Sequence, residues 1–173
     1  DDVNHVVIKG KFDITRPSVW DEKTLFSFAH ALRVYTKPMI IAANKVDRPN
    51  GKDNLHRVKK IFSYTIVPCF ADGELSLRSA DKVGMIKYIP GEKNFDVLKD
   101  LSPAQKNALE TIRHVMKEFG GTGVQEVLNY VVFDLLKYIA VFPAGAKMED
   151  SKGNVLPDCF LMPPGSTALD FAY

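Results

Sequence analysis

The stretch PMIIAANKVDR, residues 38–48, changes character halfway along. A proline is followed by five apolar residues, 39–43, and then by four polar side chains within five positions. An apolar run without alternation is typical of a strand that is buried on both faces, as in a parallel sheet. Because ligands bind at the carboxyl ends of the strands in open α/β sheets, the polar residues mark a candidate binding site.

The residues on either side of this stretch predict a βαβ unit. Periodic apolar residues predict a helix at about 54–62, and the run TIVPCF, residues 65–70, predicts a second strand. Such units cross over right-handedly and pair their strands in parallel. Before the first strand, Ser18 and Asp21 have the spacing of a capping box, which predicts a helix that starts at Ser18 and ends before Lys37. We therefore expect an α/β fold.

Beyond the βαβ unit the pattern is mostly helical. We expect a helix in 71–84, a helix with Ser102 as its N-cap that ends at Gly120, and another helix at about 124–139. The apolar spacing of the last two helices is typical of core packing, and we assign their apolar residues no chemistry. After a domain boundary near Phe142, the sequence predicts two strands and a final helix.

Composition limits the classes of function. The 173 residues carry a net charge of +2 and are 46% apolar, which is enough for a packed core but offers no basic stripe for nucleic acid. We expect neither DNA binding nor a membrane span, because no long apolar run occurs. The two cysteines lack CxxC spacing and no signal-like start is present, which favours a reducing cytoplasm. The four histidines lack metal-ligand spacing, so we expect no metal bound by this chain.

The tetrapeptide Asn44-Lys45-Val46-Asp47 suits recognition of a guanine ring. Guanine presents N1–H and an exocyclic amino group side by side, and one carboxylate can accept from both in a charge-assisted pair. Asp47 is placed for that role, while the Asn44 amide can donate to N7 and tie neighbouring loops together. The Lys45 stem can cover one face of the base. Adenine lacks this pair of donors, so such a site discriminates against it.

A second loop strengthens this interpretation. The next predicted strand ends at Cys69-Phe70-Ala71-Asp72, beside the first loop along the same edge of the sheet. The Ala71 backbone N–H can be offered to guanine O6, and a small residue there allows close approach. The alternative is an α/β domain in which NKVD is only a polar turn, since turns are rich in Asn and Asp for ordinary backbone reasons.

Longer segments of the sequence resemble those of a known family. They are RPSVWDE, KPMIIAANKVD, PCFADGELSLR, KYIPG, GTGVQEVLNYVVFDLL and LMPPGSTALDFAY. In these segments the chain resembles the Obg-like family of translation-factor-class GTPases, most closely the YchF-related, TGS-containing GTP-binding proteins of archaeal type. The resemblance implies that NKVD is the guanine-specificity motif and that Phe70-Ala71-Asp72 stands where the family has a Ser-Ala pair. Phe70 departs from that pattern, which puts the serine's support of the base loop in question and leaves the backbone donor of Ala71 unaffected.

The resemblance also implies a domain layout and a cellular role. Residues 1–36 correspond to the end of a helical insertion, and residues 37–142 to the carboxyl-terminal part of a P-loop GTPase-type parallel sheet with a helical segment. Residues 143–173 correspond to the start of a ubiquitin-like (β-grasp) TGS domain. The protein implied is cytoplasmic, binds GTP and GDP, hydrolyses GTP and is associated with the ribosome or RNA.

The phosphate half of such a site is not found. We identify no GxxxxGK[ST] loop and no DxxG that would hold the metal and orient water. We therefore expect the phosphate-binding residues, and with them Mg²⁺, upstream of Asp1, and treat the chain as a segment of a longer GTPase that is inactive alone. The rival interpretation is a non-enzymatic nucleotide sensor, or an RNA- or ribosome-binding adaptor, without a P-loop.

Overall fold

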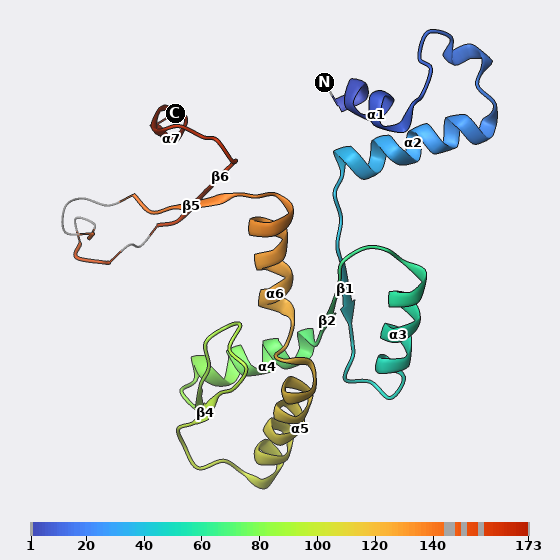
Figure 1. Cartoon of the computed structure of the whole chain (residues 1–173). Helices are drawn as coiled ribbons and strands as arrows, with labels where there is room; N and C mark the ends of the chain where they lie inside the picture. The colour runs from blue at the N-terminus through green and yellow to red at the C-terminus, as the bar shows by residue number, and fades with distance from the viewer. Residues whose placement is uncertain (1, 144–147, 150–151, 156–157, 173) are drawn as a thin grey trace. The chain divides into compact units, whose positions relative to one another are not determined.

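The computed structural model describes residues 2–143, 148–149, 152–155 and 158–172 (Figure 1). The chain forms two compact units, residues 1–40 and 41–173, and each is described by itself. Within the described part, no helix is both long enough and apolar enough to cross a membrane.

The first unit consists of two helices joined by a turn. α1 spans Asp2–Gly10, the 3₁₀ turn η1 spans Pro17–Val19, and α2 spans Glu22–Thr36. Asp21 caps α2, because its carboxylate accepts a hydrogen bond from the Thr24 N–H at 2.8 Å. The predicted helix start at Ser18 is therefore wrong. Ser18 belongs to η1, and Trp20 then takes an extended conformation that separates the turn from the helix.

The second unit begins with the expected βαβ arrangement. β1 spans Ile41–Asn44, α3 spans Gly51–Ile61, and β2 spans Ile66–Cys69. The strands pair in parallel, with Ile41 opposite Ile66 and Asn44 opposite Cys69. The prediction of two parallel strands joined by a helix is confirmed, although α3 starts earlier than expected.

The two strands differ in burial. Ile66, Val67 and Cys69 of β2 are buried, whereas the residues of β1 alternate between half-buried and exposed. The expectation that the first strand is buried on both faces is therefore wrong. Among the described residues β1 pairs with β2 alone, so no other strand in this part of the chain hydrogen-bonds to its other edge.

Two further helices and a short hairpin form the main core with this unit. α4 spans Ala71–Lys82, β3 spans Ile86–Lys87, β4 spans Asp96–Val97 and α5 spans Pro103–Phe119. The most completely buried large side chains are Leu77, Ile86 and Met116. α5 begins with the predicted capping box, in which Ser102 and Gln105 each accept the other's backbone N–H. It ends at Gly120, as predicted.

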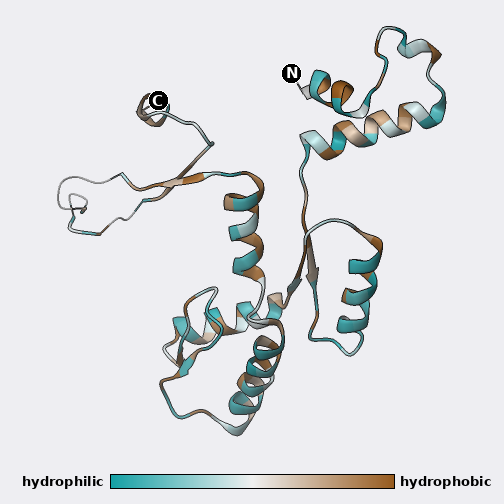
Figure 2. Cartoon of the chain, in the orientation of Figure 1, coloured by the Kyte–Doolittle hydropathy of each residue, from teal (hydrophilic) through white to brown (hydrophobic). Residues whose placement is uncertain are grey.

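The next helix differs from its prediction in length and burial. α6 spans Val124–Asn129 and continues into a π-helical turn, η2, at Tyr130–Leu135. Lys137 then takes a left-handed conformation with φ of 57°, so Ile139 lies in a strand instead of a helix. All residues of α6 and η2 are described and none is buried; Leu128 is 51% exposed. The expected core packing of this helix is therefore wrong, although Figure 2 shows hydrophobic residues along it as along α5.

The end of the chain contains a hairpin and a short helix. β5 spans Ile139–Val141 and pairs antiparallel with β6, Phe160–Met162, and α7 spans Ala168–Ala172. The Thr167 N–H donates to Asp170 Oδ2 at 2.7 Å at the start of α7. The second strand and the final helix lie where they were predicted, whereas β5 begins before the predicted boundary near Phe142. The region predicted for the first strand lies largely outside the described residues, and the described residues do not by themselves amount to a β-grasp domain.

Candidate functional site

The carboxyl ends of β1 and β2 lie next to each other. Because Asn44 is opposite Cys69 in the parallel register, the loops that follow the two strands start at the same edge of the sheet. The structure thereby brings together the two groups of residues that the sequence singled out, Asn44-Lys45-Val46-Asp47 and Phe70-Ala71-Asp72.

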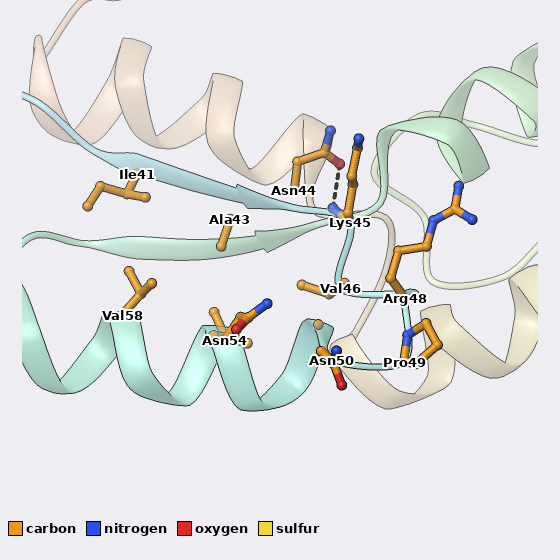
Figure 3. Close-up of a pocket in the computed structure, with 12 residues that line it drawn as sticks. Ile41, Ala43, Asn44, Lys45, Val46, Arg48, Pro49, Asn50, Asn54 and Val58 are labelled. Carbon is orange, nitrogen blue, oxygen red and sulfur yellow. Dashed lines mark hydrogen bonds between the residues drawn. The ribbon is translucent and has the colours of Figure 1, made fainter.

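The Asn44 side chain joins the two loops. Its Oδ1 accepts hydrogen bonds from the Lys45 N–H at 2.8 Å and from the Ala71 N–H at 3.2 Å. Since the N-cap residue of α4, Phe70, provides no side-chain cap, Asn44 satisfies an otherwise unpaired N–H at the start of that helix. In Figure 3 the Asn44 and Lys45 side chains rise from the face of β1 that is turned away from α3.

Lys45 ends β1 through its backbone conformation. Its φ of 67° is in the left-handed region, which non-glycine residues seldom adopt. The turn sends Val46 into the core, where it is 5% exposed and its N–H donates to the Cys69 carbonyl at 3.3 Å. The polar residues before and after Val46 are therefore anchored by a buried side chain and a contact with β2.

Arg48 links the acidic residues of the two loops. Its Nε lies 3.3 Å from Asp47 Oδ2, and its Nη2 lies 3.5 Å from Asp72 Oδ2. The Asp47 side chain is 15% exposed and that of Asp72 is 71% exposed, so Asp47 is the carboxylate that the protein encloses. The sequence interpretation missed Arg48, although its position directly after Asp47 was a usable signal.

Gly51 allows the NKVD backbone to approach α3 closely. A Cβ at this position would lie 2.6 Å from the Val46 carbonyl oxygen and 2.7 Å from that of Lys45. Both neighbours are backbone atoms, so a larger residue would displace the loop that carries Asp47. The sequence interpretation gave Gly51 no role.

Two hollows open beside β1. The larger, of about 480 Å³, lies between β1 and α3 (Figure 3) and is lined by Ile41, Ala43, Asn44, Lys45, Val46, Arg48, Pro49, Asn50, Gly51, Asn54, Leu55 and Val58. The smaller, of about 190 Å³, is lined by Ala42, Asn44, Cys69, Ala71, Val124, Val127 and Leu128. Asn44 lines both hollows, while Asp47 and Asp72 line neither.

Cys69, at the end of β2, is not a candidate nucleophile. Its burial, with a smaller contribution from the charge of Glu126, raises the pKa of the Cys69 thiol to about 11. The thiol therefore stays protonated at neutral pH, and the thiolate is the reactive form. In the part of the chain that the structure describes, no group of three or more His, Cys, Asp and Glu residues is placed to hold a metal ion.

Two DxxG spacings do occur, one at 150–153, which lies partly outside the described residues, and one at Asp81–Gly84, and the sequence interpretation overlooked both. Asp81 and Gly84 lie at the end of α4 and in the turn that follows it. Asp81 Oδ1 accepts a hydrogen bond from the Tyr88 N–H at 2.9 Å, and Gly84 has a left-handed φ of 66°. The spacing at Asp81–Gly84 is thus explained by the turn into β3, without a metal.

Comparisons with known proteins place these loops in a family. Residues 42–145 match the family described as "Obg-like GTPase YGR210-like, G4 motif-containing domain". A GTP-binding protein of Methanocaldococcus jannaschii is 44% identical over 162 residues, which cover 91% of this chain and 41% of that protein. A GTP-binding protein of Schizosaccharomyces pombe is 30% identical over 162 residues, which cover 86% of this chain and 39% of that protein.

A solved structure gives the same result. The crystal structure of a GTP-binding protein from Pyrococcus horikoshii is similar with a TM-score of 0.64 and 39% identity, over 99% of this chain and 44% of that one. The chain thus spans about two fifths of the length of the proteins that it matches. The matched segment, residues 42–145, is more than half of the 173 residues and contains both loops of the candidate site. The chain therefore belongs to the YGR210-like family of Obg-like GTPases and carries its G4 motif-containing domain.

Proposed function

We propose that the two loops recognise the guanine ring of GTP and GDP, in a protein that hydrolyses GTP to GDP. The observation that carries the proposal is the pair of hydrogen bonds at Asn44 Oδ1, which hold the NKVD loop and the Ala71 N–H together at one edge of the sheet. Membership of a GTPase family supports it.

Each side chain has a distinct role in this proposal. Asp47 accepts from guanine N1–H and from the 2-amino group, Asn44 donates to N7, and the Lys45 stem lies along one face of the base. The Ala71 N–H donates to O6. Its present contact with Asn44, at 3.2 Å, is at the long end of the range for N–H···O bonds, so we expect O6 to share this donor or take it over.

Arg48 and Asp72 are assigned supporting roles in this proposal. A bidentate pair with guanine uses both oxygens of Asp47, so Arg48, now 3.3 Å from Oδ2, must share that oxygen or release it. Asp72, at the exposed end of the second loop, holds Arg48 near the site through its own contact at 3.5 Å.

The phosphate chemistry is assigned to residues outside these 173. In this proposal the P-loop, the metal-orienting DxxG and the Mg²⁺ that accompanies the phosphates belong to another part of the protein. The family resemblance in the sequence extends the proposal to a ribosome- or RNA-associated role, and to a TGS domain that begins within residues 143–173.

Replacing Asp47 with asparagine in the full-length protein tests base recognition. An amide NH₂ would face the 2-amino donor of guanine, and the charge assistance would be lost. Truncating a buried charged pair costs about 2–5 kcal/mol. Xanthine carries a carbonyl in place of the 2-amino group. The variant should therefore gain affinity for xanthosine diphosphate as it loses affinity for GDP.

Titration calorimetry with GDP, ADP and xanthosine diphosphate provides the measurement. Asp53→Asn is the matched control, because it makes the same chemical change at an exposed carboxylate of α3 outside the two loops; it should not change the preference among bases. Equal GDP affinity in the wild type and in Asp47→Asn, or a wild type that prefers ADP, would show that NKVD is an ordinary turn.

A further inference from the structure

A buried carboxylate lies behind the second loop. Glu74 is in the first turn of α4, three residues after Ala71, and is 4% exposed. Its Oε2 accepts hydrogen bonds from the Thr122 hydroxyl at 2.5 Å and the Tyr88 hydroxyl at 2.7 Å, and its Oε1 accepts from Arg78 Nε at 2.6 Å. Burial alone would raise the pKa of Glu74, but the hydrogen bonds from Thr122, Arg78 and Tyr88 outweigh it and lower the pKa below its usual value. The carboxylate is therefore ionised at neutral pH.

Thr122 holds the second loop on both sides of Ala71. Its carbonyl oxygen accepts the Phe70 N–H at 2.8 Å, immediately before Ala71. Its hydroxyl donates to the carboxylate of Glu74, three residues after Ala71. One residue from the turn between α5 and α6 thus fixes the backbone that presents the Ala71 N–H.

Gly123 lets this turn reach the end of β2. A Cβ on Gly123 would lie 1.9 Å from the Pro68 carbonyl oxygen, and its φ of 77° is left-handed. Only a residue without a side chain fits so close to the strand in that conformation. The backbone conformation at Gly123 therefore places Thr122 against the second loop.

Phe70 gives the loop no polar side chain of its own. Its ring is 8% exposed and packs over the first turn of α4, where a Cβ on Gly73 would lie 2.4 Å from a ring carbon. The residue before Ala71 is thus a core residue, and Thr122 with Glu74 supplies the polar support of the loop from behind.

We infer that Thr122 and Glu74 are positioning residues for guanine recognition, which keep the Ala71 N–H directed at the O6 atom of the base. The inference rests on the proposed function. It concerns the O6 contact alone, because the cluster contacts the second loop and leaves the Asp47 contact with the 2-amino group to the first loop.

Thr122→Val and Thr122→Ser in the full-length protein form a matched pair. Valine has nearly the shape of threonine but no hydroxyl, whereas serine keeps the hydroxyl and loses a methyl group. Binding of three probes is measured by calorimetry: GDP, 6-thioguanosine diphosphate and inosine diphosphate. Sulfur at position 6 is a weak acceptor for the Ala71 N–H, and inosine lacks the 2-amino group that Asp47 accepts from.

The wild type should prefer GDP over the 6-thio probe by roughly threefold to tenfold, which is the range for one net hydrogen bond. Thr122→Val should shrink this ratio towards one and leave the ratio of GDP to inosine diphosphate unchanged. Thr122→Ser should restore the wild-type ratio. Glu74→Gln puts an amide among the three donors and should lower the same ratio as Thr122→Val does. The control is Glu110→Gln on the surface of α5, which should leave both ratios unchanged.

Variants that weaken all three probes equally, or that leave the ratio of GDP to the 6-thio probe unchanged, would overturn the inference and leave guanine recognition in place. A wild type that prefers GDP over ADP but does not discriminate against the 6-thio probe would also overturn it. A wild type that binds ADP as well as GDP contradicts the proposed function itself. If Thr122→Val does not fold, the Glu74→Gln and Thr122→Ser ratios decide.

Discussion

α5 and α6 have similar apolar periodicity, yet only α5 is buried. α5 buries Leu109, Ile112, Val115 and Met116 in the main core, whereas α6 and its π-helical extension, both fully described, bury no residue. Periodicity reports which side of a helix is apolar. Burial also requires a surface that covers that side. α5 finds one in the core, whereas α6 packs against β2 and borders one of the hollows beside β1.

Met116→Ala should produce the largest effect on stability. Met116 is 1% exposed at the centre of the core, so truncation leaves a cavity and should cost about 2–5 kcal/mol of unfolding free energy. Urea denaturation of the 173-residue chain measures this, with the exposed neighbour Lys117→Ala as the control. A loss as small as that of the control would mean that α5 is no better covered than α6.

Acid should weaken the junction between the two helices, where Thr122 contacts Glu74. The folded-state pKa of Glu74 is lowered, so its contribution to stability is present above the usual glutamate pKa and is lost as pH falls through the lowered value. The loss should be smaller than that of Met116→Ala, because hydrogen bonds to a neutral carboxyl remain. Urea midpoints from pH 7 to pH 3 measure it, and Glu74→Gln should remove this part of the pH dependence. Identical pH profiles for the wild type and Glu74→Gln would contradict the assignment.

Leu128→Ala should produce the smallest effect. The sequence predicts a core residue here, but Leu128 is 51% exposed, and substitutions at such positions usually change stability by less than about 0.5 kcal/mol. Leu109→Ala, the same change at a buried site of α5, is the matched control. If both substitutions cost the same, α6 is covered in solution and the difference between the helices disappears.

What the sequence predicted correctly was local. The βαβ unit, the capping box of Ser102 and the end of α5 at Gly120 follow from residues within a few positions of each other. The same reasoning correctly set the two candidate loops side by side, because parallel strands end at one edge of a sheet. It gave the wrong start for α2, because the spacing made Ser18 the N-cap and Asp21 its partner, whereas Asp21 itself accepts the Thr24 N–H and is the N-cap.

What the sequence could not show depends on distant partners. β1 is partly exposed, and β2 is the only described strand that pairs with it. No property of the residues 39–43 reveals how many strands flank them. The bond between Thr122 and Glu74 joins residues 48 positions apart and has no local pattern. The close approach of Gly51 to the NKVD backbone is likewise visible only once α3 has been placed.

Two hydrogen bonds of the second loop join partners at different separations along the chain, and this has a consequence for the order of folding. The bond from the Ala71 N–H to Asn44 closes a loop of 27 positions, and the bond from Thr122 to Glu74 closes one of 48. Loop-closure entropy grows with the logarithm of length, so the longer closure costs about 0.5 kcal/mol more. The two loops can therefore meet in an early βαβ nucleus, and the turn after α5 docks behind them later. A destabilised Thr122 contact would accordingly speed unfolding more than it slows folding.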